Sequence, residues 1–182
     1  MNAGFTSTVL GLPGIPKAAE EVQASRDLIL SGATGARLHL THVSTKGIIE
    51  MARQAKARGV RVTCDVTPHH LALTDEAVKG YKTDAKMNPP LRGAEDCEGL
   101  WQGLQDGTVD AIATDHAPHS VLEKEVEFTQ AAFGVVGLET AFGVCHNELC
   151  IEKGWPLASL IEKLTVGPAR CLGLKGGSLS VG

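Results

Sequence analysis

Few of the marks of a secreted, membrane-bound or nucleic-acid-binding protein occur in this sequence. The five cysteines form no Cys-x-x-Cys pair, and their odd number and scattered spacing argue against a disulfide framework and fit a reducing cytosol. No apolar run approaches the roughly 18 residues that span a membrane. The start, MNAGFTSTVLGLPG, lacks the pattern of a signal peptide. A net charge of −4 offers no basic surface to nucleic acid. We therefore predict a cytoplasmic protein with no nucleic-acid or membrane partner.

Several common catalytic motifs are also missing. The sequence contains no P-loop, no G-x-G-x-x-G fingerprint and no G-x-S-x-G elbow, so nothing supports phosphate binding, dinucleotide binding or serine-hydrolase chemistry. What is present is the composition of a globular domain. Its 182 residues, of which 43% are hydrophobic and 21% charged, suffice for one sizeable core.

Predicted strands and helices alternate along the chain. Apolar runs predict strands over 36–43, 60–66 and 110–114. Helical spacing and capping residues predict helices over 17–31, 46–58, 74–79, 94–106 and 137–153, and two more within 156–173. Two consecutive prolines make 86–92 a loop, because proline can neither continue a helix nor pair in a central strand.

This alternation predicts an α/β fold built from a parallel sheet. Strands separated by helices of this length form βαβ units with right-handed crossovers. Three strands are too few for a closed barrel, which needs about eight, and a free three-stranded sheet would leave two unprotected edges. We therefore expect residues 1–182 to form the C-terminal part of a (β/α)₈ TIM-type barrel. Both ends are expected to fall in loops or turns, at Leu12-Pro13-Gly14 and at the Gly-Gly-Ser-Leu-Ser-Val segment before Gly182.

A histidine closes the first predicted strand. Alternation places Leu38, Leu40 and His42 on one face and His39 on the other, toward the covering helices, where a structural role is expected. His42 is the last residue on its face, at the end where α/β barrels place their active sites. It is a candidate metal ligand, although a single histidine of this kind often only satisfies a core hydrogen bond.

An aspartate closes the third predicted strand, within Thr114-Asp115-His116-Ala117-Pro118-His119. A carboxylate after small apolar residues needs a metal or a substrate proton, unless it caps a loop. The D-x-x-x-H spacing suits Asp115 near a metal and His119 reaching the substrate. Because parallel strands end on the same rim, Asp115 and His42 can converge.

Two further segments fall on this rim, and a third offers backbone groups. Thr67-Pro68-His69-His70 follows the second strand, and the loop Lys86-Met87-Asn88-Pro89-Pro90-Leu91-Arg92 could hold the Asn88 amide against a planar ligand. A stiff connector would have the same sequence. Phe133-Gly134 offers backbone groups beside a glycine, a weak signal when taken alone.

Together these motifs resemble the bacterial-type (class I) dihydroorotases. The resemblance rests on His42-Val43-Ser44-Thr45, on Thr67-Pro68-His69-His70-Leu71, on the Lys86–Arg92 loop and on Thr114–His119, in this order and spacing. It extends to Leu10–Pro16 and so covers nearly the whole chain. Hydantoinases and allantoinases share the barrel and the metal-ligand strands but differ at the Pro-His-His and Asn-Pro-Pro-Leu-Arg positions.

The resemblance implies a barrel with a binuclear zinc site that interconverts N-carbamoyl-L-aspartate and (S)-dihydroorotate in de novo pyrimidine biosynthesis. It implies that His42 is a zinc ligand and that Asp115 both contacts metal and acts as general acid and base. It also implies four residues in contact with substrate: Asn88, His119, Phe133 and Gly134. The family's His-x-His pair, its bridging aspartate or carboxylated lysine, a further histidine and a small β-domain have no counterpart here. We therefore expect the chain to be inactive alone.

Two other functions stay open. The chain could belong to a non-catalytic dihydroorotase-like subunit that scaffolds aspartate transcarbamoylase, or to a hydantoinase-like enzyme acting on another cyclic ureide. Open sheet edges would also favour a homodimer.

Overall fold

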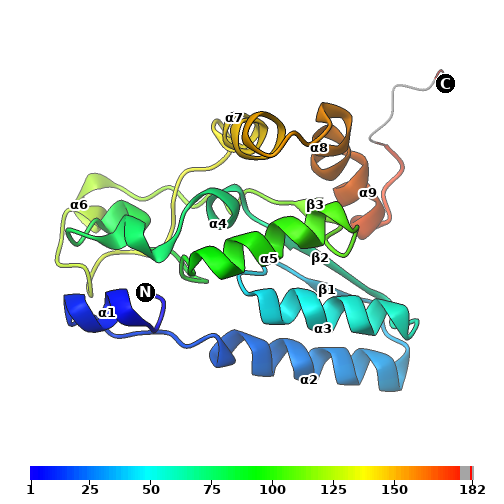
Figure 1. Ribbon diagram of the computed structural model, residues 1–182, viewed down its shortest axis with the longest axis horizontal. Helices are drawn as coiled ribbons and strands as arrows, with labels where there is room; N and C mark the ends of the chain where they lie inside the picture. Colours follow the sequence, from blue (N-terminus) through cyan, green and yellow to red (C-terminus); the bar gives the residue numbers. More distant parts are fainter. Residues whose placement is uncertain (177–180, 182) are drawn as a thin grey trace.

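Three short parallel strands form the centre of the molecule. The computed structural model describes residues 1–176 and 181, and its sheet has the order β1-β2-β3. The strands are β1 (Leu38–Leu40), β2 (Val62–Val66) and β3 (Ala111–Ile112). Leu38 lies opposite Val62 and Asp65 lies opposite Ala111, both in parallel register (Figure 1). The expected parallel sheet is confirmed, although each strand is shorter than predicted: β1 and β3 are shorter at both ends, and β2 begins at Val62 rather than at residue 60.

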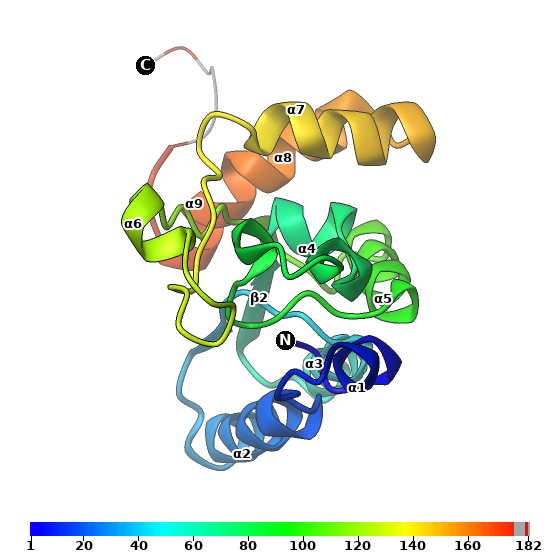
Figure 2. The same ribbon diagram turned by 90° about the vertical axis from the view of Figure 1, so that its left-hand side faces the viewer.

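Helices connect and flank these strands. They are α1 (Phe5–Leu10), α2 (Ala18–Thr34), α3 (Lys46–Ala57), α4 (Pro68–Ala72), η1 (Asp75–Val78), η2 (Thr83–Ala85), α5 (Ala94–Gln105), α6 (Val121–Lys124), α7 (Ala141–Cys145), η3 (His146–Glu152), α8 (Leu157–Leu164) and α9 (Val166–Leu172). In the view of Figure 2, β2 lies between α2 and α3 on one side and α7 and α8 on the other. Within the described residues no helix has both the length and the apolar character needed to cross a membrane.

The longer helices lie where they were predicted, and so do the short helix η1, expected over 74–79, and the pair α8 and α9, but other short helices were missed. The helix expected over 137–153 begins only at α7 and continues as the π-helix η3. The single turns α1, α4 and α6 were not predicted, because one turn is too short to show a helical period. The local sign of such a short helix is a capping residue, as at α4, where the side chain of Thr67 accepts a hydrogen bond from the His70 amide. The turn expected before Gly182 falls mostly on residues outside those described.

The core lies between the sheet and its covering helices. Helix α3 begins after Thr45, whose side chain accepts from the Ile48 amide, and it buries Ile48 and Ile49 in the core, with Ile49 next to Gly103 of α5. Further along, Trp101 of α5 meets Trp155 edge to face with the ring centroids 5.4 Å apart. Burial of these apolar side chains is what holds the helices on the sheet.

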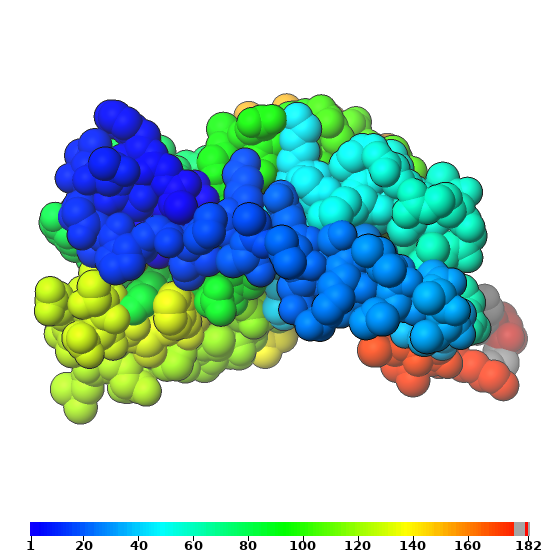
Figure 3. All heavy atoms as spheres, turned by 90° about the horizontal axis from the view of Figure 1, so that it is seen from below, coloured from blue at the N-terminus to red at the C-terminus, as the bar shows by residue number. Residues whose placement is uncertain are grey.

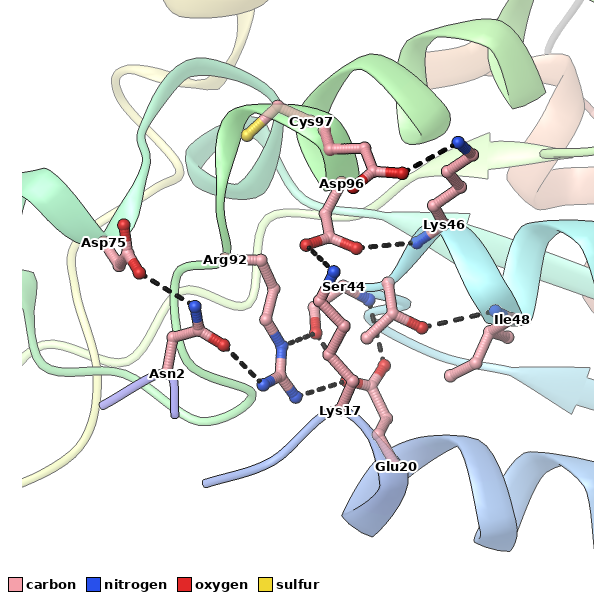
Figure 4. A network of polar contacts seen from close by, with 12 residues as sticks. Asn2, Lys17, Glu20, Ser44, Lys46, Ile48, Asp75, Arg92, Asp96 and Cys97 are labelled. Atoms are coloured by element: carbon pink, nitrogen blue, oxygen red, sulfur yellow. Dashed lines mark hydrogen bonds and ion pairs between the residues drawn. The ribbon is translucent and has the colours of Figure 1, made fainter. Parts of the chain in front are cut away.

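The buried side chain of Arg92 joins the ends of several elements (Figure 4). Its guanidinium, in a residue only 2% exposed, donates to the Ser44 hydroxyl at 3.1 Å and to the Ile15 carbonyl at 2.8 Å. It also contacts the side chains of Asn2 and Glu20, at 3.1 and 3.2 Å. The N-terminal segment, α2 and the loop after β1 are therefore fixed to the loop that contains Asn88.

The space around Gly103 in α5 and around Gly143 in α7 predicts opposite effects on stability when each glycine is replaced by alanine. A Cβ at Gly103 would lie 2.8 Å from Cγ2 of Ile49 and 2.9 Å from Cγ2 of Val109, whereas a Cβ at Gly143 in α7 would meet nothing within 4 Å. We expect Gly103→Ala to lower the free energy of unfolding by about 1–3 kcal/mol through overpacking. The matched control Gly143→Ala should raise it by about 0.5–1 kcal/mol through helix propensity. Urea unfolding measures both, and a stabilised Gly103→Ala variant would contradict this packing.

Candidate functional site

The residues that follow β1 and β3 bring an imidazole and a carboxylate together. Nε2 of His42 lies 3.6 Å from Oδ1 of Asp115, and both side chains are partly exposed, at 24% and 29%. This separation is too long for a hydrogen bond. The two candidate metal ligands, 73 residues apart in the sequence (115 − 42), therefore face each other across a gap that a cation could fill.

A third residue, Asp65 in β2, orients His42 and was not singled out from the sequence. One carboxylate oxygen of Asp65 accepts from the His42 amide at 2.8 Å and contacts Nδ1 of the His42 ring at 3.1 Å. The other oxygen contacts Nε2 of His39 at 2.8 Å and accepts from the Thr41 hydroxyl at 2.9 Å. The only signal in the sequence was a single carboxylate inside the apolar strand VTCDV, which must find buried partners.

The charges of this cluster favour an ionised Asp65. Burial opposes ionisation, but hydrogen bonds from His39, His42 and Thr41 outweigh it and hold the pKa of Asp65 well below its usual range. The same hydrogen bond to Asp65 raises the pKa of His42; burial opposes this shift, and the charge of Asp115 adds to it. With Nδ1 of His42 engaged by a carboxylate, Nε2 is the nitrogen that faces Asp115.

The face predicted for His39 is wrong. Leu38 and Leu40 pack with Leu28 of α2 and with α3, so the leucines occupy the helix-facing side and His39 lies on the opposite face. His42 does not share the leucine face either. The strand ends at Leu40, and His42 has a φ of 55°, which breaks the alternation and turns its ring to the carboxylate that His39 also contacts.

Backbone strain is a shared property of the facing pair. Asp115 has a φ of 47°, close to that of His42, and both lie in the left-handed region that residues other than glycine rarely adopt. Such a conformation costs on the order of 1–3 kcal/mol and persists where the surroundings impose it, which is common at functional sites.

The loop after β3 brings His119, Phe133 and Gly134 together. Nε2 of His119 lies 2.8 Å from the Phe133 carbonyl oxygen, and the Gly134 amide donates to the Lys86 carbonyl at 3.0 Å. Gly134 has a φ of 141°, and a Cβ there would lie 2.6 Å from the Ala117 carbonyl oxygen, so the close approach requires glycine. Three of the four predicted substrate contacts therefore form one wall beside Asp115.

Two buried lysines hold this wall in place. The ammonium of Lys86 donates to the carbonyls of Thr129 and Ala131, at 3.0 and 2.6 Å, and lies 4.5 Å from the ring centroid of Phe133. Lys124 donates to the carbonyls of Thr83 and Ala132, both at 3.0 Å. Burial lowers the pKa of both lysines. The carbonyl groups that accept from the two lysines belong to η2 and to the segment before Phe133. The ammonium groups therefore hold that segment against the rest of the molecule.

The fourth predicted contact, Asn88, lies at a cavity whose lining includes neither His42 nor Asp115. It is exposed and, with His39, Thr41 and Arg92, lines this cavity of about 440 Å³ between α2 and β1. No hydrogen bond joins Asn88 to His42, Asp115 or His119 in the part of the chain that the structure describes. In Figure 3 the N-terminal segment and α2 (blue) cross this face of the molecule beside the loop around residues 120–135.

The facing pair fits two ligands of one zinc ion. Donors that each lie about 2.0–2.1 Å from a tetrahedral zinc stand about 3.4 Å apart, close to the observed 3.6 Å. A metal-bound histidine usually gives its other ring nitrogen to a carboxylate, as His42 does with Asp65. Within residues 1–176 and 181, however, no group of three or more His, Cys, Asp or Glu side chains could hold a metal. The described residues thus supply part of a metal site.

The low pKa of Asp65 predicts how stability depends on pH. Because the folded-state pKa is depressed, the carboxylate stabilises the fold above its unfolded pKa of about 3.9, and this contribution is lost as the pH falls below that value. We expect Asp65→Asn to lower the free energy of unfolding at pH 6. The difference from the unmodified protein should shrink steadily between pH 4 and pH 2. Urea unfolding across this range measures it, and a difference that does not change with pH would refute the assignment.

Comparisons with known proteins agree with this geometry. The model of the amidohydrolase family matches residues 18–182. The chain is 53% identical to a dihydroorotase from Pelotomaculum thermopropionicum and 58% identical to one from Anaeromyxobacter sp. (strain K), in both cases over 100% of its length. It covers 43% and 42% of these relatives, so it spans less than half of their length. The resemblance to dihydroorotases is confirmed.

Solved structures with the same fold include hydantoinases. An L-hydantoinase (dihydropyrimidinase) from Arthrobacter aurescens superposes with a TM-score of 0.83 at 30% identity, over 89% of this chain and 37% of that one. A D-hydantoinase (dihydropyrimidinase) from Thermus sp. gives 0.85 at 25% identity, over 92% and 38%. The expected partial TIM-type barrel is thereby confirmed, and the chain belongs to the amidohydrolase family.

Proposed function

We propose that this chain forms part of the active site of a dihydroorotase, which interconverts N-carbamoyl-L-aspartate and (S)-dihydroorotate. The observation that carries the proposal is the pair His42 and Asp115, 3.6 Å apart on one rim, in a chain 53% identical to a dihydroorotase along its whole length. The reaction would serve de novo pyrimidine biosynthesis in the cytoplasm.

His42 and Asp115 are the residues that would hold zinc. Bound zinc would polarise the ring amide carbonyl and lower the pKa of a water molecule. The binuclear centre expected from the family needs more donors than the described residues offer, so the rest of the ligand set would come from a longer polypeptide or from a second chain. Asp65 would act on this site indirectly, by fixing the ring of His42.

Asp115 is the residue that would move the proton. Its carboxylate is partly exposed and lies at the end of β3, beside the wall of His119, Phe133 and Gly134. From there it would accept a proton from the attacking water and deliver it to the leaving nitrogen of the ring, which is general base and then general acid catalysis.

The wall would orient the substrate. The Phe133 carbonyl already faces His119 at 2.8 Å, but a carbonyl oxygen has a second lone pair that a substrate N–H could use. His119 would contact the substrate through its ring, and Asn88 would contribute an amide from the neighbouring loop. Holding the ring in this way keeps the reacting atoms aligned.

A hydantoinase-like activity is the second candidate, because two superposed hydantoinases are 30% and 25% identical to this chain over the matched residues. A panel of dihydroorotate, hydantoin and dihydrouracil would separate the two. Association with aspartate transcarbamoylase, with or without catalysis, and formation of a homodimer remain proposals that size-exclusion chromatography would test.

We predict that the 182-residue chain alone does not hydrolyse dihydroorotate, because its described residues supply only part of the metal site. Joined to the remaining part of a dihydroorotase-length polypeptide, it should turn over dihydroorotate, and Asp115→Asn should lower kcat about 10²–10⁴-fold, the usual contribution of a general acid or base. The measurement is turnover with added zinc. Turnover by the chain alone above that of its His42→Ala variant would refute the first expectation, and an active Asp115→Asn enzyme would refute the second.

A further inference from the structure

The motif Thr67-Pro68-His69-His70 has no role in the function proposed above. It forms α4, which begins directly after β2, the middle strand of the sheet. The two histidines therefore stand between the strand end that carries His42 and the one that carries Asp115. Both are buried, at 8% and 2% exposure.

His70 is fully accounted for by structure. Its Nδ1 lies 2.7 Å from the Thr67 hydroxyl oxygen and its Nε2 lies 3.0 Å from the Pro89 carbonyl oxygen. Burial lowers the pKa of His70 to about 3. Because both ring nitrogens have partners, this neutral ring ties α4 to the loop that contains Asn88 and offers nothing to a ligand.

His69 differs from its neighbour. Its ring lies against that of His70 with the centroids 4.6 Å apart, yet its Nε2 is buried and has no hydrogen-bond partner among the described residues. The charged groups close enough to act on it are Asp115 and His42, the facing pair itself. Burial lowers the pKa of His69 to about 4, so the ring is neutral at physiological pH and has one donor and one acceptor nitrogen.

A buried polar atom without a partner is rare and costly in a native protein. The cost is recovered if a ligand supplies the missing partner. The ring of a cyclic ureide carries alternating N–H and C=O groups along its edge, so it can satisfy a neutral imidazole in either tautomer.

We infer that His69 is a substrate-contacting residue, whose Nε2 hydrogen-bonds to the N–H/C=O edge of the cyclic ureide bound beside His42 and Asp115. This inference rests on the proposed function and deepens it, because it assigns a polar contact that would favour a ureide over an apolar ring. A site built for such a bond discriminates against ligands that cannot make it, since they leave the buried nitrogen unpaired.

The test uses the zinc-loaded full-length protein that carries this chain, with the variants His69→Leu and His69→Gln and the matched control His70→Leu. We expect His69→Leu to lower kcat/KM for dihydroorotate about 10- to 100-fold, the effect of losing a buried hydrogen bond, and His69→Gln to recover part of it. Without substrate, His69→Leu should retain its zinc content and its Tm, whereas His70→Leu should lose Tm.

Binding gives a readout separate from turnover. Dihydroorotate should raise the Tm of the unmodified protein by more than it raises the Tm of His69→Leu. Unchanged kcat/KM in His69→Leu would overturn the inference, as would a loss of Tm equal to that of His70→Leu, which would make His69 structural. A loss of zinc would overturn it too, because His69 would then be a metal ligand. If the unmodified protein does not turn over dihydroorotate, the proposed function fails first and this inference with it; normal turnover with an unaffected His69→Leu refutes the inference alone.

Discussion

The buried guanidinium of Arg92 is the contact on which the arrangement of the rim depends. A buried charge is tolerated only where its hydrogen bonds are satisfied. The partners of Arg92 come from three other parts of the chain: the N-terminal segment (Asn2 and Ile15), α2 (Glu20) and the loop after β1 (Ser44). Ser44 lies two residues after His42, and Arg92 closes the loop that begins with Asn88 (Figure 4). One side chain therefore fixes the spacing between the end of β1, next to His42, and the loop that contains Asn88. The apolar core holds the helices on the sheet, but it does not determine this spacing.

A second buried polar group, Asp65, orients the side chain of His42 within this arrangement. It lies in the middle strand and contacts residues that follow β1. These contacts hold the imidazole of His42 in one orientation, with Nε2 directed at Asp115. The left-handed backbone at His42 and Asp115 directs both side chains toward each other. Backbone strain, a buried carboxylate and a His69 nitrogen that has no partner among residues 1–176 and 181 thus lie at one end of the sheet. Such departures from local preference are common at functional sites.

Much of the architecture could be predicted from the sequence, because it depends on the spacing of apolar residues and on the residues that interrupt helices and strands. The amphipathic runs of α2, α3 and α5 and the apolar runs of the three strands predicted the βαβ order, and prolines predicted the loop before Arg92. The single-turn helices α1, α4 and α6 did not follow, since a segment of four to six residues shows no period. The C-terminal ends of β1 and β3 were predicted too long, because Thr41, Val43 and Thr114, which follow these strands, are β-branched like typical strand residues.

The functional site was likewise predicted only in part from the sequence. The sequence alone determined which residues stand at the strand ends, His42 and Asp115 among them, and the family whose motifs they form, because these depend on order and spacing along the chain. Only the tertiary structure decided which face His39 takes, that Asp65 orients His42, and that His69 rather than His70 has a ring nitrogen without a partner in the described part of the chain. The physical reason is that hydrogen-bond partners come from segments far apart in the chain. Alternation, the one local rule for side-chain direction, ends where the backbone at His42 turns left-handed.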